Sequence, residues 1–130
     1  MTREEILAME PGEAMDTLIL DEVLKWEKRQ MWWGETRWVV DRKTNDGKDI
    51  HVDLELFSPS TDISAAWEVV EKLQESHLYI DIRTCADFYE VWITIHREGN
   101  QTETFASPKL PEAICKAALV LYWEEKMHDD

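Results

Sequence analysis

The chain has 130 residues, and 44% of them are hydrophobic, with seven Trp among them. This length suits one domain over residues 1–130, and the composition excludes a disordered chain. The net charge of -14 disfavours a partnership with long nucleic acid, because contacts to phosphate dominate such binding. No apolar run approaches the roughly eighteen residues of a membrane span, so we expect no membrane partner and a place in the cytoplasm.

Two helices are predicted at the start of the chain. Thr2 and Glu5 have the spacing of a capping box, so a short helix should run to about Met9. A second, longer helix follows from apolar residues that recur at helical spacing, and we expect it to end near Gln30. The residues that trace its face are Met15, Leu18, Ile19, Glu22, Val23 and Trp26.

Two β-hairpins are predicted further along. Thr36 to Arg42 is rich in β-forming residues, and Asp46-Gly47 in the turn that follows is typical of a hairpin. The return strand alternates from Ile50 to Phe57. The second hairpin is expected at residues 78–82 and 88–96, with a short edge strand over residues 102–106.

The segment from Ser58 to Leu73 predicts the central helix. Pro59 ends the preceding loop, and Ser60, Thr61 or Asp62 offers an N-cap. The apolar stripe that follows consists of Ile63, Ala66, Trp67, Val70 and Leu73. We expect this helix to run from about Asp62 to Glu75 and to pack on the sheet through Trp67 and Val70.

A last helix is predicted after Pro108 and Pro111, with Ile114, Ala117, Ala118, Leu121 and Tyr122 on its buried side. The order of elements predicts an α+β fold, in which three helices pack on a mostly antiparallel sheet of four or five strands. Both faces of the strand at residues 88–96 carry apolar side chains. We therefore expect a homo-oligomer, most simply a two-fold dimer.

Three blocks of the sequence resemble a known family. They are residues 3–16, which contain Met9-Glu10-Pro11-Gly12; residues 60–73, which contain Ala65-Ala66-Trp67-Glu68; and residues 111–119, which contain Pro111-Glu112-Ala113-Ile114-Cys115. Together they are similar to the phage ABA sandwich domain family of small phage and prophage proteins. The resemblance implies an α/β sandwich and a phage origin, and it implies no catalytic residues.

Catalytic and metal-binding motifs do not stand out. The four His, at positions 51, 77, 96 and 128, and the two Cys, Cys85 and Cys115, have no spacing typical of a zinc site. Asp53, Glu55 and Asp81 could form a carboxylate cluster, although a solvated strand face explains them equally well. With four Gly in the chain there is no Gly-rich phosphate loop. We therefore predict no catalytic residues, no metal and no cofactor, and favour a protein that is not an enzyme.

One segment has an unusual composition. Between Lys25 and Lys48 lie seven of the fourteen basic residues, but only four of the 28 acids. Aromatic rings can stack on a base and Arg can hold phosphate. The candidate ligand-binding residues are therefore Trp32, Trp33, Arg37, Trp38 and Arg42, joined by Ser60, Thr61 and Asp62 at the start of the central helix. The alternative is that these Trp belong to the core or its edge, and that the Arg residues pair with nearby acids.

Two functions compete on this evidence. The first is a phage accessory protein that binds a small anionic nucleotide, for example a counter-defence sponge that sequesters a host immune signal in the bacterial cytoplasm. The second is an acidic protein inhibitor, which mimics DNA or covers a basic surface of a host protein. The sequence names neither the ligand nor the host partner.

Overall fold

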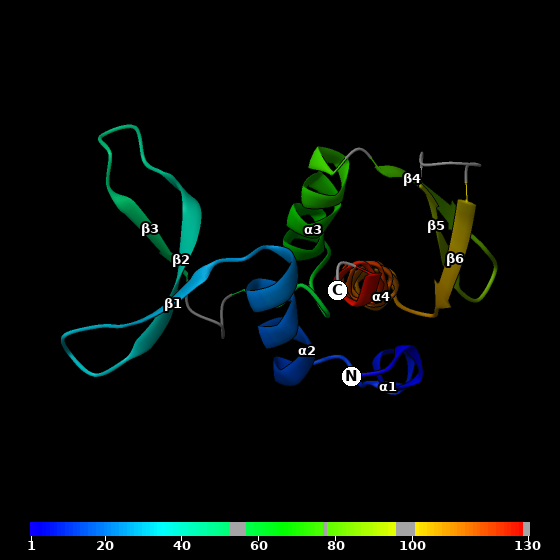
Figure 1. Ribbon diagram of the computed structural model, residues 1–130, viewed down its shortest axis with the longest axis horizontal. Helices are drawn as coiled ribbons and strands as arrows, with labels where there is room; N and C mark the ends of the chain where they lie inside the picture. Colours follow the sequence, from blue (N-terminus) through cyan, green and yellow to red (C-terminus); the bar gives the residue numbers. More distant parts are fainter. Residues whose placement is uncertain (53–56, 77, 96–100, 129–130) are drawn as a thin grey trace.

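The computed structural model describes residues 1–52, 57–76, 78–95 and 101–128. Within these ranges the chain forms three layers, with a sheet on either side of a layer of helices (Figure 1). The helices are α1 (Arg3–Ala8), α2 (Glu13–Leu18), the π-helix η1 (Ile19–Val23), α3 (Ile63–Glu75) and α4 (Leu110–His128). The strands are β1 (Glu27–Gln30), β2 (Thr36–Lys43), β3 (Asp49–Val52), β4 (Leu78–Thr84), β5 (Tyr89–Ile95) and β6 (Gln101–Ser107).

The N-terminal helices begin as expected, but the second one ends earlier than predicted. The Thr2 hydroxyl accepts a hydrogen bond from Glu5 N at 3.2 Å and caps α1. After η1 the backbone of Lys25 turns to a φ of 57°, and this left-handed conformation ends the helix. Glu27–Gln30 then forms β1 instead of a last helical turn, so the prediction of a helix to Gln30 is wrong.

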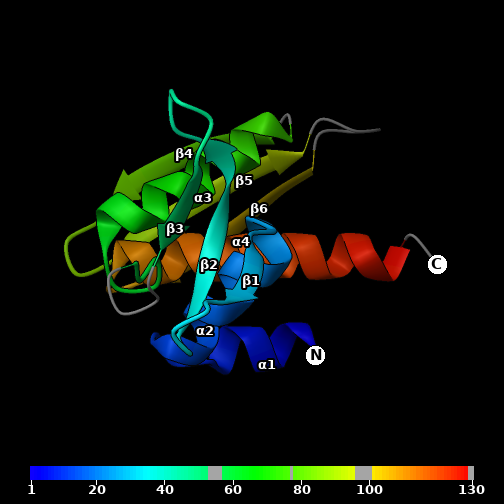
Figure 2. The ribbon, with the colours of Figure 1, turned by 90° about the vertical axis from the view of Figure 1, so that its left-hand side faces the viewer.

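The first sheet has the order β1-β2-β3, and both of its pairs are antiparallel. Its second turn contains Gly47 at a φ of 84°, which confirms the hairpin predicted at Asp46-Gly47. Trp26 and Trp38 anchor the sheet in the core, and the Trp26 ring lies 4.9 Å from that of Phe57 between centroids. Figure 2 shows β2 running across the direction of α4. The part of the return strand at residues 53–56, with Asp53 and Glu55, lies outside the described residues.

The second sheet has the order β4-β5-β6 and confirms the second hairpin and the edge strand. One face packs on α3 and α4, where Val91 and Ile93 of β5 are buried. On the other face the guanidinium of Arg83 lies 4.4 Å from the centre of the Trp92 ring and covers it in part. The homo-oligomer stays a prediction.

The central helix is present, and Ala66, Val70 and Leu73 of its predicted apolar stripe are buried, but the other two members of the stripe are not. Asp62 caps α3 by accepting a hydrogen bond from Ser64 N at 3.0 Å. Val69 is fully buried, whereas Ile63 is 45% and Trp67 is 48% exposed. The prediction that the helix packs through Trp67 is therefore wrong. α4 and η1 lie beside the flank of α3 that carries Val69, so this flank is buried in the core and the flank with Trp67 is not.

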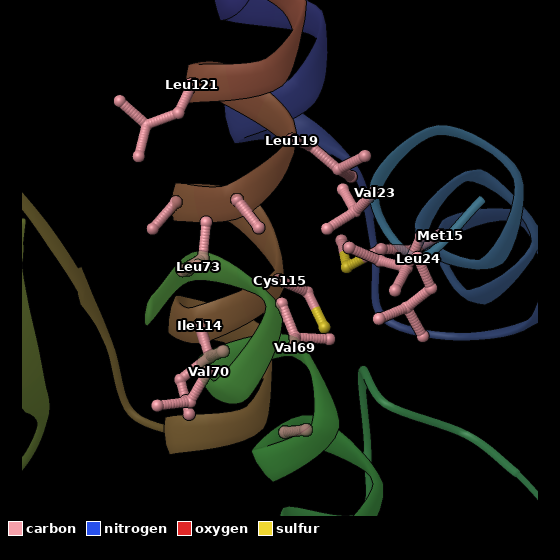
Figure 3. Close-up of a cluster of buried hydrophobic side chains, with 14 of the residues drawn as sticks. Met15, Val23, Leu24, Val69, Val70, Leu73, Ile114, Cys115, Leu119 and Leu121 are labelled. Atoms are coloured by element: carbon pink, nitrogen blue, oxygen red, sulfur yellow. The ribbon is translucent and has the colours of Figure 1, made fainter. Parts of the chain in front are cut away.

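The core lies where α2, η1, α3 and α4 meet. Figure 3 shows side chains from these helices converging, with Cys115 of α4 close to Val69 of α3 and Met15 of α2. All three residues are fully buried. The small residues of α4, among them Ala117 and Ala118, let the neighbouring helices approach closely.

The α+β class with antiparallel sheets is confirmed, while the number and grouping of the strands differ from the prediction. Six strands form two three-stranded sheets within the described residues, instead of one sheet with four or five. The additional strand is β1, which comes from the segment predicted as the end of a helix. The helix layer keeps the two hairpins apart, so they do not share a sheet.

We expect Leu73→Ala to lower the free energy of unfolding by about 2–5 kcal/mol, because it leaves a cavity in the core. Leu73 is 1% exposed and belongs to the main cluster of buried side chains. Trp67→Ala, on the same helix, should cost clearly less, since its residue is 48% exposed. Urea unfolding of both variants measures this, and an equal or larger loss for Trp67→Ala would mean that its flank of α3 is buried.

Candidate binding site

The turn between β1 and β2 presents two Trp side chains to solvent. Gly34, at a φ of 99°, donates from its N–H to the carbonyl of Met31 at 3.0 Å and closes the turn. Trp32 is 92% exposed and Trp33 is 48% exposed. Their rings meet edge to face, with centroids 5.4 Å apart. Two adjacent Trp cannot both point into one core from a strand or helix, and both of these rings reach solvent.

Arg37 lies at the same turn and completes what we call the aromatic tip, namely Trp32, Trp33 and Arg37. Its guanidinium carbon lies 5.7 Å from the centre of the Trp33 ring, within the range of a cation–π contact. Its Nη2 also pairs with a carboxylate oxygen of Glu35 at 3.2 Å. Because both partners of this ion pair are partly exposed, the pair holds the Arg side chain beside the ring without greatly stabilising the fold.

Trp38, another residue predicted in this segment, does not join the aromatic tip. Trp38 is 4% exposed and faces the core, so its ring offers no face to a ligand; the prediction that it stacks on a base is wrong. The ammonium of Lys28 lies 5.9 Å from the centre of that ring. Arg42 lies in β2, and its side chain is outside the described part of the structure.

The turn that contains Ser60, Thr61 and Asp62 has a structural role. The Ser60 hydroxyl accepts a hydrogen bond from Gly12 N at 2.9 Å, and Ser60 itself is fully buried. The Thr61 hydroxyl lies 2.6 Å from that of Ser58. One carboxylate oxygen of Asp62 accepts the hydrogen bond that caps the N-terminus of α3.

The two halves of the predicted site are also separated in space. In Figure 1 the turn between β1 and β2 lies at the far left, whereas the start of α3 lies near the middle of the molecule. The structure therefore brings Trp32, Trp33 and Arg37 together, and it does not bring Ser60, Thr61 or Asp62 to them.

Asp16 is the residue that the sequence analysis missed. It is 3% exposed, and its carboxylate accepts hydrogen bonds from Ser58 Oγ at 2.6 Å and from Ser60 N at 2.8 Å. A signal for it exists in the sequence, because an acid three and four residues before Ile19 and Leu20 falls on the apolar face of a helix. An acid on such a face needs a hydrogen-bonding partner within the fold.

Neither cysteine has the character of a nucleophile. Burial raises the pKa of the Cys115 thiol, and the negative charge of nearby Asp16 raises it further. Partial burial likewise raises the pKa of Cys85, whose thiol donates a hydrogen bond to Glu90 at 3.3 Å. Thiols with raised pKa values stay protonated at neutral pH, whereas a nucleophilic or metal-binding Cys needs the thiolate.

Among the described residues, His, Cys, Asp and Glu side chains do not gather in any group of three that could hold a metal ion. His77 and His96 lie outside the described residues, and the side chains of His51 and His128 are not described either.

Comparison with known proteins places the chain in a family. The sequence profile of the phage ABA sandwich domain matches residues 17–119, which is most of the chain. The protein belongs to the phage ABA sandwich domain family. Neither the curated proteins nor the solved structures include a match to it. Two of the three blocks that carried the resemblance, residues 60–73 and 111–119, fall in the matched range, while the block at residues 3–16 precedes it.

The structure brings these three blocks together at Asp16. This residue closes the first block, binds Ser60 at the start of the second, and lies close enough to Cys115 of the third to affect its pKa. Blocks that are distant in sequence thus meet around one buried carboxylate. None of the helices that can be described is long and apolar enough to span a bilayer.

We expect Asp16→Ala to lower the free energy of unfolding by about 1–3 kcal/mol, because it leaves the buried N–H of Ser60 without an acceptor. Asp21→Ala is the matched control, since Asp21 is exposed on the following helical turn, and it should change stability by no more than about 0.5 kcal/mol. Chemical unfolding of the two variants provides the comparison. Equal stabilities would show that the hydrogen bonds of Asp16 do not hold the loop.

Proposed function

We propose that this phage protein is not an enzyme and acts by binding, with the aromatic tip as its contact. The observation that carries the proposal is the 92% exposure of Trp32 beside Trp33 and Arg37. A large ring exposed to this extent contributes little to the stability of the isolated chain, whereas Trp and Arg are the residues that contribute most to binding when they become buried.

In its most specific form, the proposal is that the tip binds a small nucleotide and sequesters it, as a counter-defence protein would do with a host immune signal such as an ADP-ribose derivative or a cyclic nucleotide. An exposed Trp face suits stacking on a base, and Arg37 suits a phosphate. The charge distribution supports a small ligand. The segment from Lys25 to Lys48 has seven basic residues and four acids, while the rest of the chain has seven basic residues and 24 acids.

A second candidate function rests on the exposure of Trp32 together with the net charge of -14. Trp32 is open to solvent on almost all sides, as a side chain that enters a pocket of another protein would be. The strongly acidic remainder of the protein would suit a host protein with a basic surface. In this form the protein is an inhibitor, and the ring of Trp32 buries itself in the partner.

Calorimetric titration with a panel of mononucleotides, cyclic nucleotides and ADP-ribose derivatives tests the first form. If a nucleotide binds, Trp32→Ala or Trp33→Ala should weaken binding by about 1–3 kcal/mol, the usual contribution of one stacked ring. Arg37→Ala should weaken it as well. The melting temperature should hardly change, because the Trp32 side chain contributes little to the core.

Trp67→Ala is the matched control, since Trp67 is also about half exposed but lies on α3 in the helix layer, away from the tip. It should bind the nucleotide as the parent protein does. If no nucleotide of the panel binds, or if the tip variants bind like the parent, sequestration of a nucleotide by the aromatic tip is contradicted and the inhibitor becomes the better account. Salt dependence separates the two, because an acid-driven protein partnership weakens steeply as salt is added.

A further inference from the structure

A groove lies on the opposite side of the molecule from the aromatic tip, between α1 and β6. It has a volume of about 320 Å³. Arg3 and Leu7 of α1 form one wall, residues 104–106 of β6 form the other, and Ala113 and Lys116 of α4 contribute the remaining side chains. Leu7 is 42% exposed and Ala113 is 1% exposed, so an apolar side chain in the groove would meet apolar atoms.

The wall formed by β6 is the free edge of a sheet. In the order β4-β5-β6, β6 pairs with β5 and with no other strand in the described part of the chain. In an antiparallel pair every second residue directs its N–H and C=O groups away from its partner strand. The edge of β6 therefore offers a row of main-chain donors and acceptors, and such a row is a template for another strand.

The charged side chains that line the groove are both cationic, although acids outnumber basic residues 28 to 14 in the whole chain. Arg3 is fixed by Glu103 at 3.0 Å and by Glu124 at 2.7 Å, and both bonds use its Nη1. Its Nε and Nη2 groups make no hydrogen bond to a described residue. The guanidinium of Arg3 is thus held in place, and its Nε and Nη2 donors are available to a ligand.

Lys116 is held in a similar way. Its Nζ donates to the carbonyl of Leu7 at 2.7 Å and pairs with Glu112 at 2.7 Å. Burial alone would raise the pKa of Glu112, but hydrogen bonds from Lys116 and Ser107 outweigh it and lower that pKa, so the carboxylate stays charged and keeps the ammonium at the groove. Because this ammonium is already fixed by a backbone carbonyl and a carboxylate, binding of a ligand costs little further side-chain entropy.

We propose that this groove receives an extended polypeptide segment of a partner protein, which adds to the edge of β6 as a fourth strand and presents a carboxylate to Arg3 and Lys116. Strand addition of this kind takes its affinity from main-chain hydrogen bonds and its specificity from pockets for alternate side chains. The carboxylate is required because the charged side chains that meet the guest are the two cations.

Other occupants fit less well. A small anion would meet the two cations but could not use the strand edge. A second copy of this chain would bring another net charge of -14 to the contact, and like charges oppose such an association. The inference does not depend on the aromatic tip, which lies on the far side of the helix layer (Figure 1).

The test uses random heptapeptides with a free C-terminal carboxylate, selected on the 130-residue protein and counter-selected on its Leu7→Glu variant. That substitution places a negative charge at the groove on an exposed helical position, so the fold should persist. For the selected peptides we expect fluorescence polarisation to show at least a tenfold weaker affinity for Leu7→Glu and an unchanged affinity for Trp32→Ala. Amide exchange should slow in β6 when the peptide binds.

Two modified peptides separate the parts of the proposal. Methylation of alternate backbone nitrogens should abolish binding, because it removes the main-chain donors, and amidation of the C-terminus should weaken it when the selected sequence has no other carboxylate. The proposal is overturned if no peptide prefers the parent protein to Leu7→Glu, if methylated peptides still bind, or if slowed exchange appears outside β6. A dimer in light scattering that Leu7→Glu dissociates would overturn it in favour of a second copy. None of these outcomes bears on nucleotide binding at the tip.

Discussion

The carboxylate of Asp16 is the constraint on which the arrangement of the helices depends. It is buried and therefore needs hydrogen bonds, which Ser58 Oγ and Ser60 N supply. The return bond from Gly12 N to the Ser60 hydroxyl ties the same loop to the start of α2. Because α3 begins three residues after Ser60, these bonds fix its first turn against α2, with the α4 residue Cys115 near the same carboxylate.

The two surfaces proposed for binding lie on either side of this helix layer. The first sheet is anchored through Trp26, Trp38 and Phe57, and its first turn carries the aromatic tip into solvent. The second sheet rests on α3 and α4 and leaves the edge of β6 open beside α1. The helix layer thus has an exposed aromatic tip on one side and an open strand edge on the other.

Local signals in the sequence predicted most of the elements. The capping box at Thr2, the Asp46-Gly47 turn and the alternation in β4 and β5 each depend on a few neighbouring residues, and each is confirmed. The failures have tertiary causes. A stripe through Ala66, Val70 and Leu73 has two flanks of similar hydrophobicity, and only the position of the neighbouring helices decided that Val69 is buried and Trp67 is not. The backbone turn at Lys25 could not be predicted, because no Gly or Pro lies near it in the sequence. At the candidate site, exposure of adjacent Trp could be predicted, but the burial of Ser60 by Asp16 could not, because it joins residues 44 positions apart.

A double-mutant cycle between Asp16→Ala and Ser58→Ala tests most directly whether this one carboxylate couples α2 to the loop before α3. The free energies of unfolding of the parent, the two single variants and the double variant are measured in urea under identical conditions. If the account holds, the two substitutions are coupled by about 1 kcal/mol or more, because each removes one partner of the same buried hydrogen bond. Losses that add within about 0.5 kcal/mol would show that the two side chains act independently, and would contradict the central role given to Asp16.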